Sequence, residues 1–279
     1  MRLSLLVFTD LDGTLLDHHN YSAEPALPLL RKLDELDIPW IINTSKTASE
    51  LLEVRQRLHN RHPFIAENGA AVFIPQGYFP QAEMLNEAQP WQDYQCWAFG
   101  PPRAALREAV AALRERYRFH AVGDMTLDDM CRYTELSADA ARRAMDRQFT
   151  EPLIWNDSDA ALDDIRHELA EQGLQVVRGG RFVHVMGRFD KGQAMTWLAA
   201  RYAYHWQDRP YVVALGDSDN DRPMLAAADH AVVVRSPVHA PLQMPGHRHV
   251  LTTDLTGPSG WAVAITALLT RHGVDVVGA

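Results

Sequence analysis

The chain of 279 residues is long enough for one large domain and an inserted smaller one. Hydrophobic residues make up 47% of it and charged residues 23%, a balance typical of a folded globular protein and not of a disordered one. The net charge of −9 argues against a nucleic-acid partner, although an anionic small molecule can still bind where a cation offsets the field.

The first quarter of the sequence predicts alternating strands and helices. Leu3–Phe8 is short and apolar on both faces, which suits a central strand of a parallel sheet. A helix is expected around Glu24–Leu36 and a second buried strand at Ile38–Asn43. Thr47 and Glu50 then have capping-box spacing ahead of another helix. This alternation indicates βαβ units with right-handed crossovers.

The middle of the chain breaks the alternation. Ile74–Tyr94 is rich in Pro, Gln and aromatic residues and predicts a domain boundary. Ser158 is the expected N-cap of a helix that ends at Gly173. The stretch LQVVRGGRFVHV then predicts a hairpin that turns at Gly179–Gly180.

The last part returns to alternating strands and helices. The expected elements are a helix at 191–204, a strand at 211–217, a helix at 222–228, strands at 230–234 and 247–253, and a helix at 259–271. We therefore predict an α/β fold with a doubly wound, mainly parallel, Rossmann-like core domain at residues 1–84 and 187–279. Residues 85–186 are predicted to form an inserted α+β domain.

Polar side chains gather where the predicted core strands end. Asp10 and Asp12 end the first strand, Thr44 follows the second, Asp217 ends a late one, and Lys191 opens a late helix. Because ligands of doubly wound sheets bind outside the carboxyl ends of the strands, we expect these residues to meet at one edge. Asp10 and Asp12 start on the same side of an extended chain, although alone the pair could be a solvated strand-end turn.

The stretch GDSDND also suggests a calcium loop. Asp217, Asp219 and Asp221 match the first three alternate ligand positions of an EF-hand. However, Arg222 occupies the position that requires glycine, and Ala228 occupies that of the bidentate glutamate. Magnesium fits better, because it takes few carboxylates together with water and substrate oxygens.

These motifs resemble the haloacid dehalogenase superfamily of phosphatases over nearly the whole chain. They are DLDGT, a hydroxyl residue after the second strand, a later lysine and a final GDxxxD. The finer motifs FTDLDGTLLD, TSKT, PFIAENGA, GGRFVH and GDSDNDRPML resemble the mannosyl-3-phosphoglycerate phosphatases within it. Thr44 stands where serine is expected and keeps the hydroxyl, and Asp219 stands where proline is expected and adds a charge.

The superfamily resemblance implies a mechanism with Mg²⁺ as cofactor. Asp10 would attack phosphorus and form an aspartyl-phosphate, and Asp12 would protonate the leaving alkoxide and then deprotonate water. Thr44 and Lys191 would hold the non-bridging oxygens. The implied metal ligands are Asp10, the backbone carbonyl of Asp12, Asp217 and, through water or by steadying Lys191, Asp221.

The same resemblance makes the inserted domain a cap that selects the substrate. The predicted substrate-binding residues are Thr44, Ser45, Lys46, Glu67, Asn68, Arg178, Gly179, Gly180, Arg181 and Asn220. The alternatives are a solvated side chain at Lys46, an Asn-Gly turn at residues 68–69, and an exposed hairpin with solvated arginines.

The expected function is Mg²⁺-dependent hydrolysis of the phosphate monoester of mannosyl-3-phosphoglycerate, which gives mannosylglycerate and phosphate. The partner would be a small phosphorylated sugar acid. The alternatives are the glucosyl compound, a broader range of sugar phosphates, phosphotransfer as in the phosphomutases, and a metal-binding protein without catalysis.

Two further features concern the setting of the protein. Cys96 and Cys131 have neither disulfide nor metal-ligand spacing, so we expect reduced thiols in a cytoplasmic protein. The apolar start at Leu3–Phe8 is too short for a signal segment, and no apolar run approaches about 18 residues. We therefore expect no membrane partner.

Overall fold

A computed structural model describes residues 4–80, 88–178 and 182–274. Within these residues, nine strands form one large sheet and four form a small sheet. From edge to edge, the large sheet consists of β13 (Val250–Thr256), β12 (His230–Arg235), β11 (Tyr211–Gly216), β1 (Leu5–Thr9), β2 (Trp40–Asn43), β3 (Phe64–Ala66), β4 (Ala71–Pro75), β6 (Tyr94–Ala98) and β5 (Gln89–Trp91).

The large sheet is mainly parallel and is covered by helices on both faces. The strands from β13 to β3 run parallel to one another. The pairs of β3 with β4, β4 with β6 and β6 with β5 are antiparallel. Leu5 and Val7 of β1 face one apolar layer, whereas Leu6 and Phe8 face the other. This two-sided burial explains why β1 is apolar at every position, and it confirms the predicted doubly wound fold.

Each face of the large sheet has its own helices. The first apolar layer lies under α1 (Leu27–Glu35), α2 (Ala48–Arg57) and α9 (Gly257–Arg271). The second lies under α7 (Lys191–Trp206) and α8 (Arg222–Ala227). Among the described residues, the short 3-10 helices are η1 (Glu24–Ala26), η2 (Glu67–Gly69), η4 (Val122–Asp124) and η5 (Asp219–Asp221).

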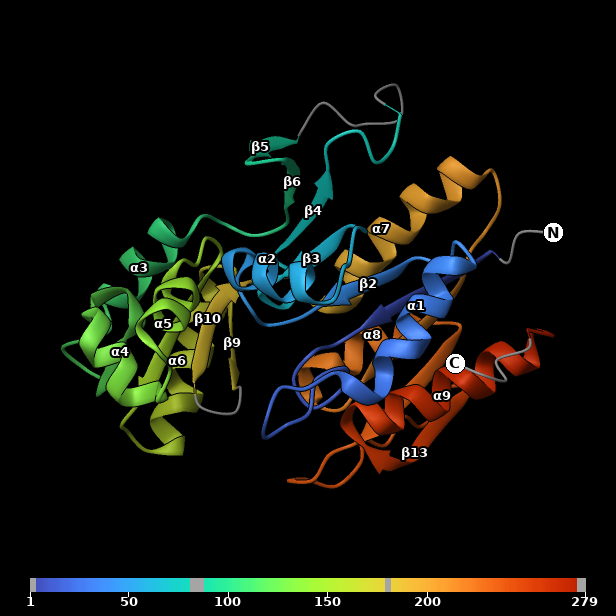
Figure 1. The fold of residues 1–279 in the computed structure, drawn as a ribbon. Helices are drawn as coiled ribbons and strands as arrows, with labels where there is room; N and C mark the ends of the chain where they lie inside the picture. The colour runs from blue at the N-terminus through green and yellow to red at the C-terminus, as the bar shows by residue number, and fades with distance from the viewer. Residues whose placement is uncertain (1–3, 81–87, 179–181, 275–279) are drawn as a thin grey trace.

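The small sheet has an antiparallel order of β7 (Phe119–Ala121), β8 (Thr150–Trp155), β10 (Val183–Gly187) and β9 (Leu174–Arg178). Its helices are α3 (Arg103–Ala111), α4 (Leu127–Thr134), α5 (Ala138–Met145) and α6 (Asp159–Glu171). In Figure 1 this part, coloured green to yellow, lies to the left of the large sheet. We refer to it below as the insert.

The predicted helix starts follow from local capping chemistry. Thr47 and Glu50 form the predicted capping box at the start of α2. Ser158 accepts the predicted cap bond from the amide of Ala161 at the start of α6. These contacts depend on residues three positions apart, which is why the sequence alone predicts them.

Residues 89–98 differ from the prediction. We expected them in the inserted domain, but they form β5 and β6 at the edge of the large sheet. The rings of Trp91 and Phe73 lie 4.9 Å apart, and that of Tyr94 lies 5.3 Å from Phe64. This aromatic packing joins segments that are distant in the sequence, so local composition did not reveal it.

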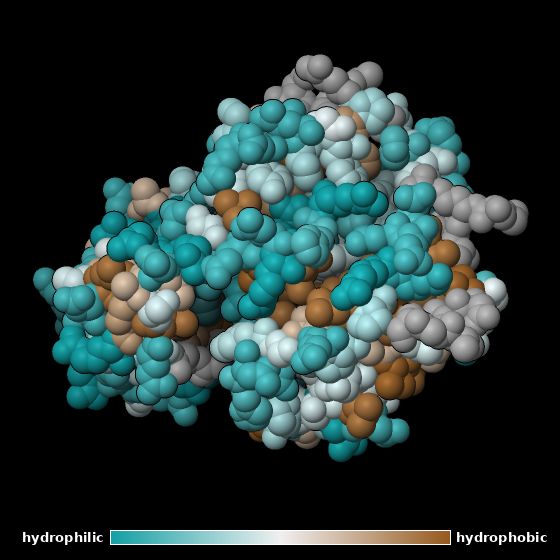
Figure 2. Space-filling model, viewed as in Figure 1, coloured by the Kyte–Doolittle hydropathy of each residue, from teal (hydrophilic) through white to brown (hydrophobic). Residues whose placement is uncertain are grey.

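Hydrophilic side chains cover most of the face drawn in Figure 2, and the hydrophobic ones lie in small separate groups. Within the described ranges, no helix has both the length and the apolar character that a bilayer span requires.

Candidate active site

The edge of the large sheet brings Asp10 and Asp217 together. Asp10 directly follows β1, and Asp217 directly follows β11, the parallel neighbour of β1. The amide of Asp10 donates to the carbonyl of Leu215 at 2.9 Å, which extends the pairing to the ends of the strands. Thr44, which follows β2, is buried at the same edge, and its amide donates to the carbonyl of Ile65 at 3.1 Å.

A buried lysine lies between two of the acids. The Nζ of Lys191 lies 2.6 Å from Oδ1 of Asp10 and 2.6 Å from Oδ1 of Asp221. Lys191 and Asp221 are fully buried, and Asp10 is 5% exposed. Such short charge-assisted bonds fix all three side chains, so the nucleophile predicted from the sequence has a defined orientation.

The loop after β11 is ordered by the carboxylate of Asp221. Its Oδ2 accepts the amides of Asp217 and Ser218, both at 3.1 Å, while its Oδ1 binds Lys191. Gly216 is required here, because an added Cβ would lie 2.5 Å from Cβ of Asp221. Asp221 therefore supports Lys191 and the loop, which is one of the two roles predicted for it.

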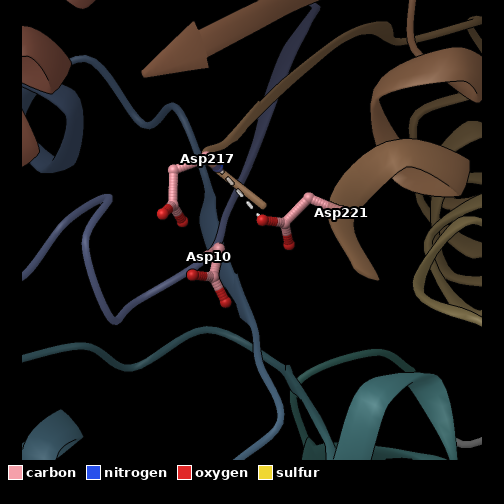
Figure 3. A group of neighbouring side chains, drawn as sticks. All are labelled: Asp10, Asp217 and Asp221. Atoms are coloured by element: carbon pink, nitrogen blue, oxygen red, sulfur yellow. Dashed lines mark hydrogen bonds between the residues drawn. The ribbon is translucent and has the colours of Figure 1, made fainter. Parts of the chain in front are cut away.

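Three carboxylates converge at this edge. Figure 3 shows Asp10, Asp217 and Asp221, and one ligand atom from each lies within 4.8 Å of the others. All three are buried. The hydroxyl of Thr14 donates to Asp217 at 3.1 Å, and Gly13 (φ +83°) keeps the chain clear of the same carboxylate.

The electrostatics of this cluster fit a bound cation. Burial, followed by repulsion from Asp221, raises the pKa of Asp10 well above its usual value. The same two causes raise the pKa of Asp217 to about 6. Burial alone would lower the pKa of Lys191, but Asp10 and Asp221 outweigh it and raise that pKa. Three carboxylates against one ammonium leave excess negative charge, and carboxylate oxygens are the donors that Mg²⁺ takes.

Asp12 is not part of this group of three acids and pairs with another lysine. Its Oδ2 is 2.8 Å from Nζ of Lys46, whose side chain is mostly buried. Burial lowers the pKa of Lys46, but the charges of Asp12 and Glu50 outweigh it and raise that pKa. Lys46 is thus tied to Asp12 and is not the solvated lysine of the alternative interpretation.

The turn at Glu67–Gly69 has an unusual backbone. Its three residues have φ of +51°, +62° and +92°. A left-handed conformation costs non-glycine residues roughly 1–2 kcal/mol each, so the surrounding contacts must hold this turn. The Oδ1 of Asn68 accepts a 3.0 Å bond from Asn220, and an added Cβ on Gly69 would lie 2.2 Å from the carbonyl of Asp190. The alternative of an Asn-Gly turn thus describes this segment.

Several predicted substrate-binding residues have partners within the protein. Both carboxylate oxygens of Glu67 accept bonds from residues 148–150 of the insert. The side chain of Arg178 is 53% exposed and lies 3.1 Å from Asp159, as in the alternative of an exposed hairpin. Gly179, Gly180 and Arg181 lie outside the described residues. The carbonyl of Ser45 accepts a 3.2 Å bond from Arg147.

The structure also brings in residues that the sequence reasoning missed. Nε2 of His239 lies 3.4 Å from Oδ2 of Asp217. Trp261 of α9 donates to the hydroxyl of Thr9 at 3.0 Å, and that hydroxyl donates to the carbonyl of Asp10 at 2.7 Å. Neither has a local sequence signal, since their partners are 22 and 252 positions away. Thr14 could have been found, because it belongs to the DLDGT motif.

Because of His184 on β10, we expect the free energy of unfolding to depend on pH. His184 is 7% exposed, and its Nδ1 has no hydrogen-bond partner among the described residues. Burial, and then the charge of Arg147, lower its pKa to about 3. The unfolded chain binds a proton there below about pH 6.5, so His184 lowers the free energy of unfolding as pH drops from 7 towards 5, and its contribution to this loss is about 2 kcal/mol at pH 5.

Urea unfolding at pH 7 and pH 5 tests this expectation. In His184→Gln, the loss of stability between the two pH values should be smaller than in the wild type by about 2 kcal/mol. The exposed His120 of the same sheet provides the matched control, since His120→Gln should leave the loss unchanged. Equal losses in the wild type and His184→Gln would show that His184 is not a buried neutral group.

Comparisons with known proteins find relatives over nearly the whole chain. Residues 7–89 match the profile of the haloacid dehalogenase-like hydrolases, and residues 153–249 match that of sucrose-6F-phosphate phosphohydrolase. A glucosyl-3-phosphoglycerate/mannosyl-3-phosphoglycerate phosphatase of Persephonella marina is 33% identical over 95% of this chain and 97% of its own. A phosphatase of the same name from Methanococcoides burtonii is 33% identical over 96% of this chain and 98% of its own.

A solved structure supports the fold alone. A Streptococcus mutans crystal structure superposes with a TM-score of 0.67 at 19% identity, over 95% of this chain and 98% of that one. Given the near full-length relatives and the family profile, the chain belongs to the haloacid dehalogenase-like hydrolases. Within that family it is a phosphoric monoester hydrolase.

Proposed function

We propose that the protein is a Mg²⁺-dependent phosphatase that hydrolyses mannosyl-3-phosphoglycerate to mannosylglycerate and phosphate. The observation that carries this proposal is the buried cluster of Asp10, Asp217, Asp221 and Lys191 in a chain with two near full-length relatives of that activity. Because the name of those relatives includes the glucosyl compound, glucosyl-3-phosphoglycerate is a second candidate substrate.

In the first step, Asp10 attacks phosphorus. An Asp10 carboxylate oxygen forms a bond to phosphorus while the bond from phosphorus to the glycerate oxygen breaks. The leaving alkoxide takes a proton from Asp12. Lys191, at 2.6 Å from Asp10, and the Thr44 hydroxyl stabilise the negative charge that is spread over the non-bridging oxygens.

In the second step, water attacks phosphorus of the aspartyl-phosphate. Asp12 takes a proton from the water, the bond between Asp10 and phosphorus breaks, and inorganic phosphate leaves. A covalent intermediate divides one difficult displacement into two easier ones. Lys46, which pairs with Asp12 at 2.8 Å, limits the orientations of that side chain.

Asp10 and Asp217, together with the backbone carbonyl of Asp12, would hold the Mg²⁺. Asp221 would steady Lys191 and the loop, since both of its oxygens already have partners there. When bound, the metal ion supplies positive charge that reduces the repulsion between the Asp10 carboxylate and the phosphate dianion.

We assign the role of a substrate-selecting cap to the insert. Its strands run from β7 at Phe119 to β10 at Gly187, and its first helix begins at Arg103. We propose that this cap begins after β6 and not at residue 85, since β5 and β6 pair with the large sheet.

Phosphate release from a substrate panel tests the function. We expect kcat/KM for the two glycosyl-3-phosphoglycerates to exceed that for hexose 6-phosphates by at least about 10²-fold. Excess chelator should reduce the rate by roughly 10²-fold or more, because a catalytic cation contributes several kcal/mol, and added Mg²⁺ should restore it.

The other outcomes of this assay favour the alternatives. Equal turnover of hexose phosphates would support a broader sugar-phosphate phosphatase, which the match to the sucrose-6F-phosphate phosphohydrolases also suggests. Isomerisation of a sugar phosphate without release of phosphate would indicate a phosphomutase. Full activity in excess chelator would contradict the role of the metal.

A further inference from the structure

The carboxylate of Glu67 connects the large sheet with the insert. Glu67 lies just after β3, and its Oε1 accepts the amide of Gln148 at 2.8 Å. Its Oε2 accepts the amide of Phe149 at 3.2 Å and the hydroxyl of Thr150 at 2.5 Å. These three donors are consecutive residues at the point where the chain enters β8.

The Glu67 carboxylate is buried, and its negative charge is compensated by its neighbours. Glu67 is 2% exposed and Thr150 is fully buried. Two backbone amides, a hydroxyl and, at 4.0 Å, the guanidinium of Arg147 surround the carboxylate. A buried carboxylate with this many donors is a stable structural anchor and has no free oxygen for a substrate.

The backbone of the same turn is part of the phosphate-binding edge. The amide of Glu67 donates to the carbonyl of Lys46, and that of Asn68 donates to the carbonyl of Thr44, both at 2.9 Å. Asn68 also bonds Asn220 in the loop that carries Asp217. These bonds hold the turn against the loops on both sides of Asp10, and none of them involves the Glu67 carboxylate.

Arg147 lies between the two parts. Its Nη1 donates to the carbonyl of Ser45 at 3.2 Å and to the hydroxyl of Thr150 at 3.0 Å. The position of residues 148–150 thus determines where this guanidinium lies relative to the Thr44–Lys46 loop. A cation at this place would interact with a leaving group that is itself anionic. It would not interact in the same way with the phosphate group that all substrates share.

We propose that Glu67 is a positioning residue that fixes the insert, through residues 147–150, in register with the phosphate-binding loop. Its contribution is therefore to substrate choice, for leaving groups that reach the insert. This inference rests on the proposed function, because it assumes that a sugar-acid leaving group extends from phosphorus towards the insert.

The variant Glu67→Gln is the direct test. Glutamine has nearly the same size, but one of its terminal atoms is an NH₂ group that cannot accept from the amides or the hydroxyl. We expect kcat/KM for glycosyl-3-phosphoglycerate to fall by roughly 10–10²-fold, because small misplacements of a substrate-positioning group have effects of this order. For p-nitrophenyl phosphate, the fall in kcat/KM should stay within about threefold. Its leaving group carries no sugar acid, so its position does not depend on the insert.

Amide hydrogen exchange gives a readout that does not depend on activity. The amides of Gln148 and Phe149 bond the Glu67 carboxylate, so Glu67→Gln should increase their exchange rates by about tenfold or more. Glu53→Gln is the matched control: Glu53 is a largely exposed carboxylate of α2 that pairs with Arg143 of the insert. This change should alter neither the substrate ratio nor the exchange at 148–149.

The results separate this inference from the proposed function. If the wild type does not hydrolyse glycosyl-3-phosphoglycerates, the proposed function fails, while the exchange experiment still tests the anchor. If Glu67→Gln leaves exchange unchanged, or lowers activity on both substrates equally, Glu67 is not a positioning residue. Should Glu67→Gln fail to fold, Thr150→Val removes only one donor, and an unchanged substrate ratio in that variant would also contradict the proposal.

Discussion

The Asp10→Asn variant should lose phosphate release almost completely while it keeps its fold. The amide of asparagine is a poor nucleophile, so no aspartyl-phosphate can form. We expect kcat to fall by at least roughly 10⁴-fold, on the order that follows removal of a nucleophile from other enzymes. The metal-dependent phosphoenzyme should disappear together with the turnover.

Rapid acid quenching with ³²P-labelled substrate measures both quantities in the same samples. Asp37→Asn is the control, because Asp37 is an exposed aspartate in a left-handed conformation (φ +52°) that asparagine also adopts. Its activity should match that of the wild type. Normal turnover by Asp10→Asn would show that the nucleophile is a different residue.

Replacing Lys191 with methionine should reduce both activity and stability. Methionine keeps the length of the side chain but leaves the buried carboxylates of Asp10 and Asp221 without their ammonium partner. Removal of one partner from a buried charge pair costs about 3–5 kcal/mol, so we expect a decrease of this order in the free energy of unfolding at pH 7. Loss of one charge that stabilises the transferring phosphoryl group should also lower kcat by roughly 10²–10³-fold.

Urea unfolding in excess chelator measures the stability effect, since no metal ion can then replace the ammonium. The loss should be smaller at pH 5 than at pH 7, because burial and the charge of Asp221 raise the pKa of Asp10, and protonation of Asp10 removes its repulsion with Asp221. Lys32→Met is the control: Lys32 forms a partly exposed pair with Glu35 on α1, and its loss should change stability by less than about 0.5 kcal/mol. A similar small change for Lys191→Met would contradict the compensating role of the ammonium.

Much of the core was predictable because its signals are local. The apolar run of β1 reports burial on both faces, and the caps at Thr47 and Ser158 involve residues three positions apart. The meeting of Asp10 with Asp217 follows from one further rule, that parallel neighbouring strands end at the same edge of a sheet.

The roles of residues at the boundary were less predictable. Glu67 follows the third core strand and was therefore expected to bind substrate, but its carboxylate accepts bonds from residues 148–150. Likewise, the composition of residues 74–94 indicated a boundary, whereas β5 and β6 extend the large sheet. In both cases the partner lies in another segment, and no property of the local sequence specifies it.

The amino-acid sequence alone determined the type of fold, the order of its elements and the acids and lysine at the strand and helix ends. These depend on periodicity, on capping and on chain direction, which act over a few residues. The tertiary structure alone decided that Lys191 lies between Asp10 and Asp221, that Lys46 pairs with Asp12, and that Glu67 bonds the insert. The reason is physical: a buried charge takes as its partner whichever group packing brings within bonding distance, and packing joins residues that are far apart in the chain.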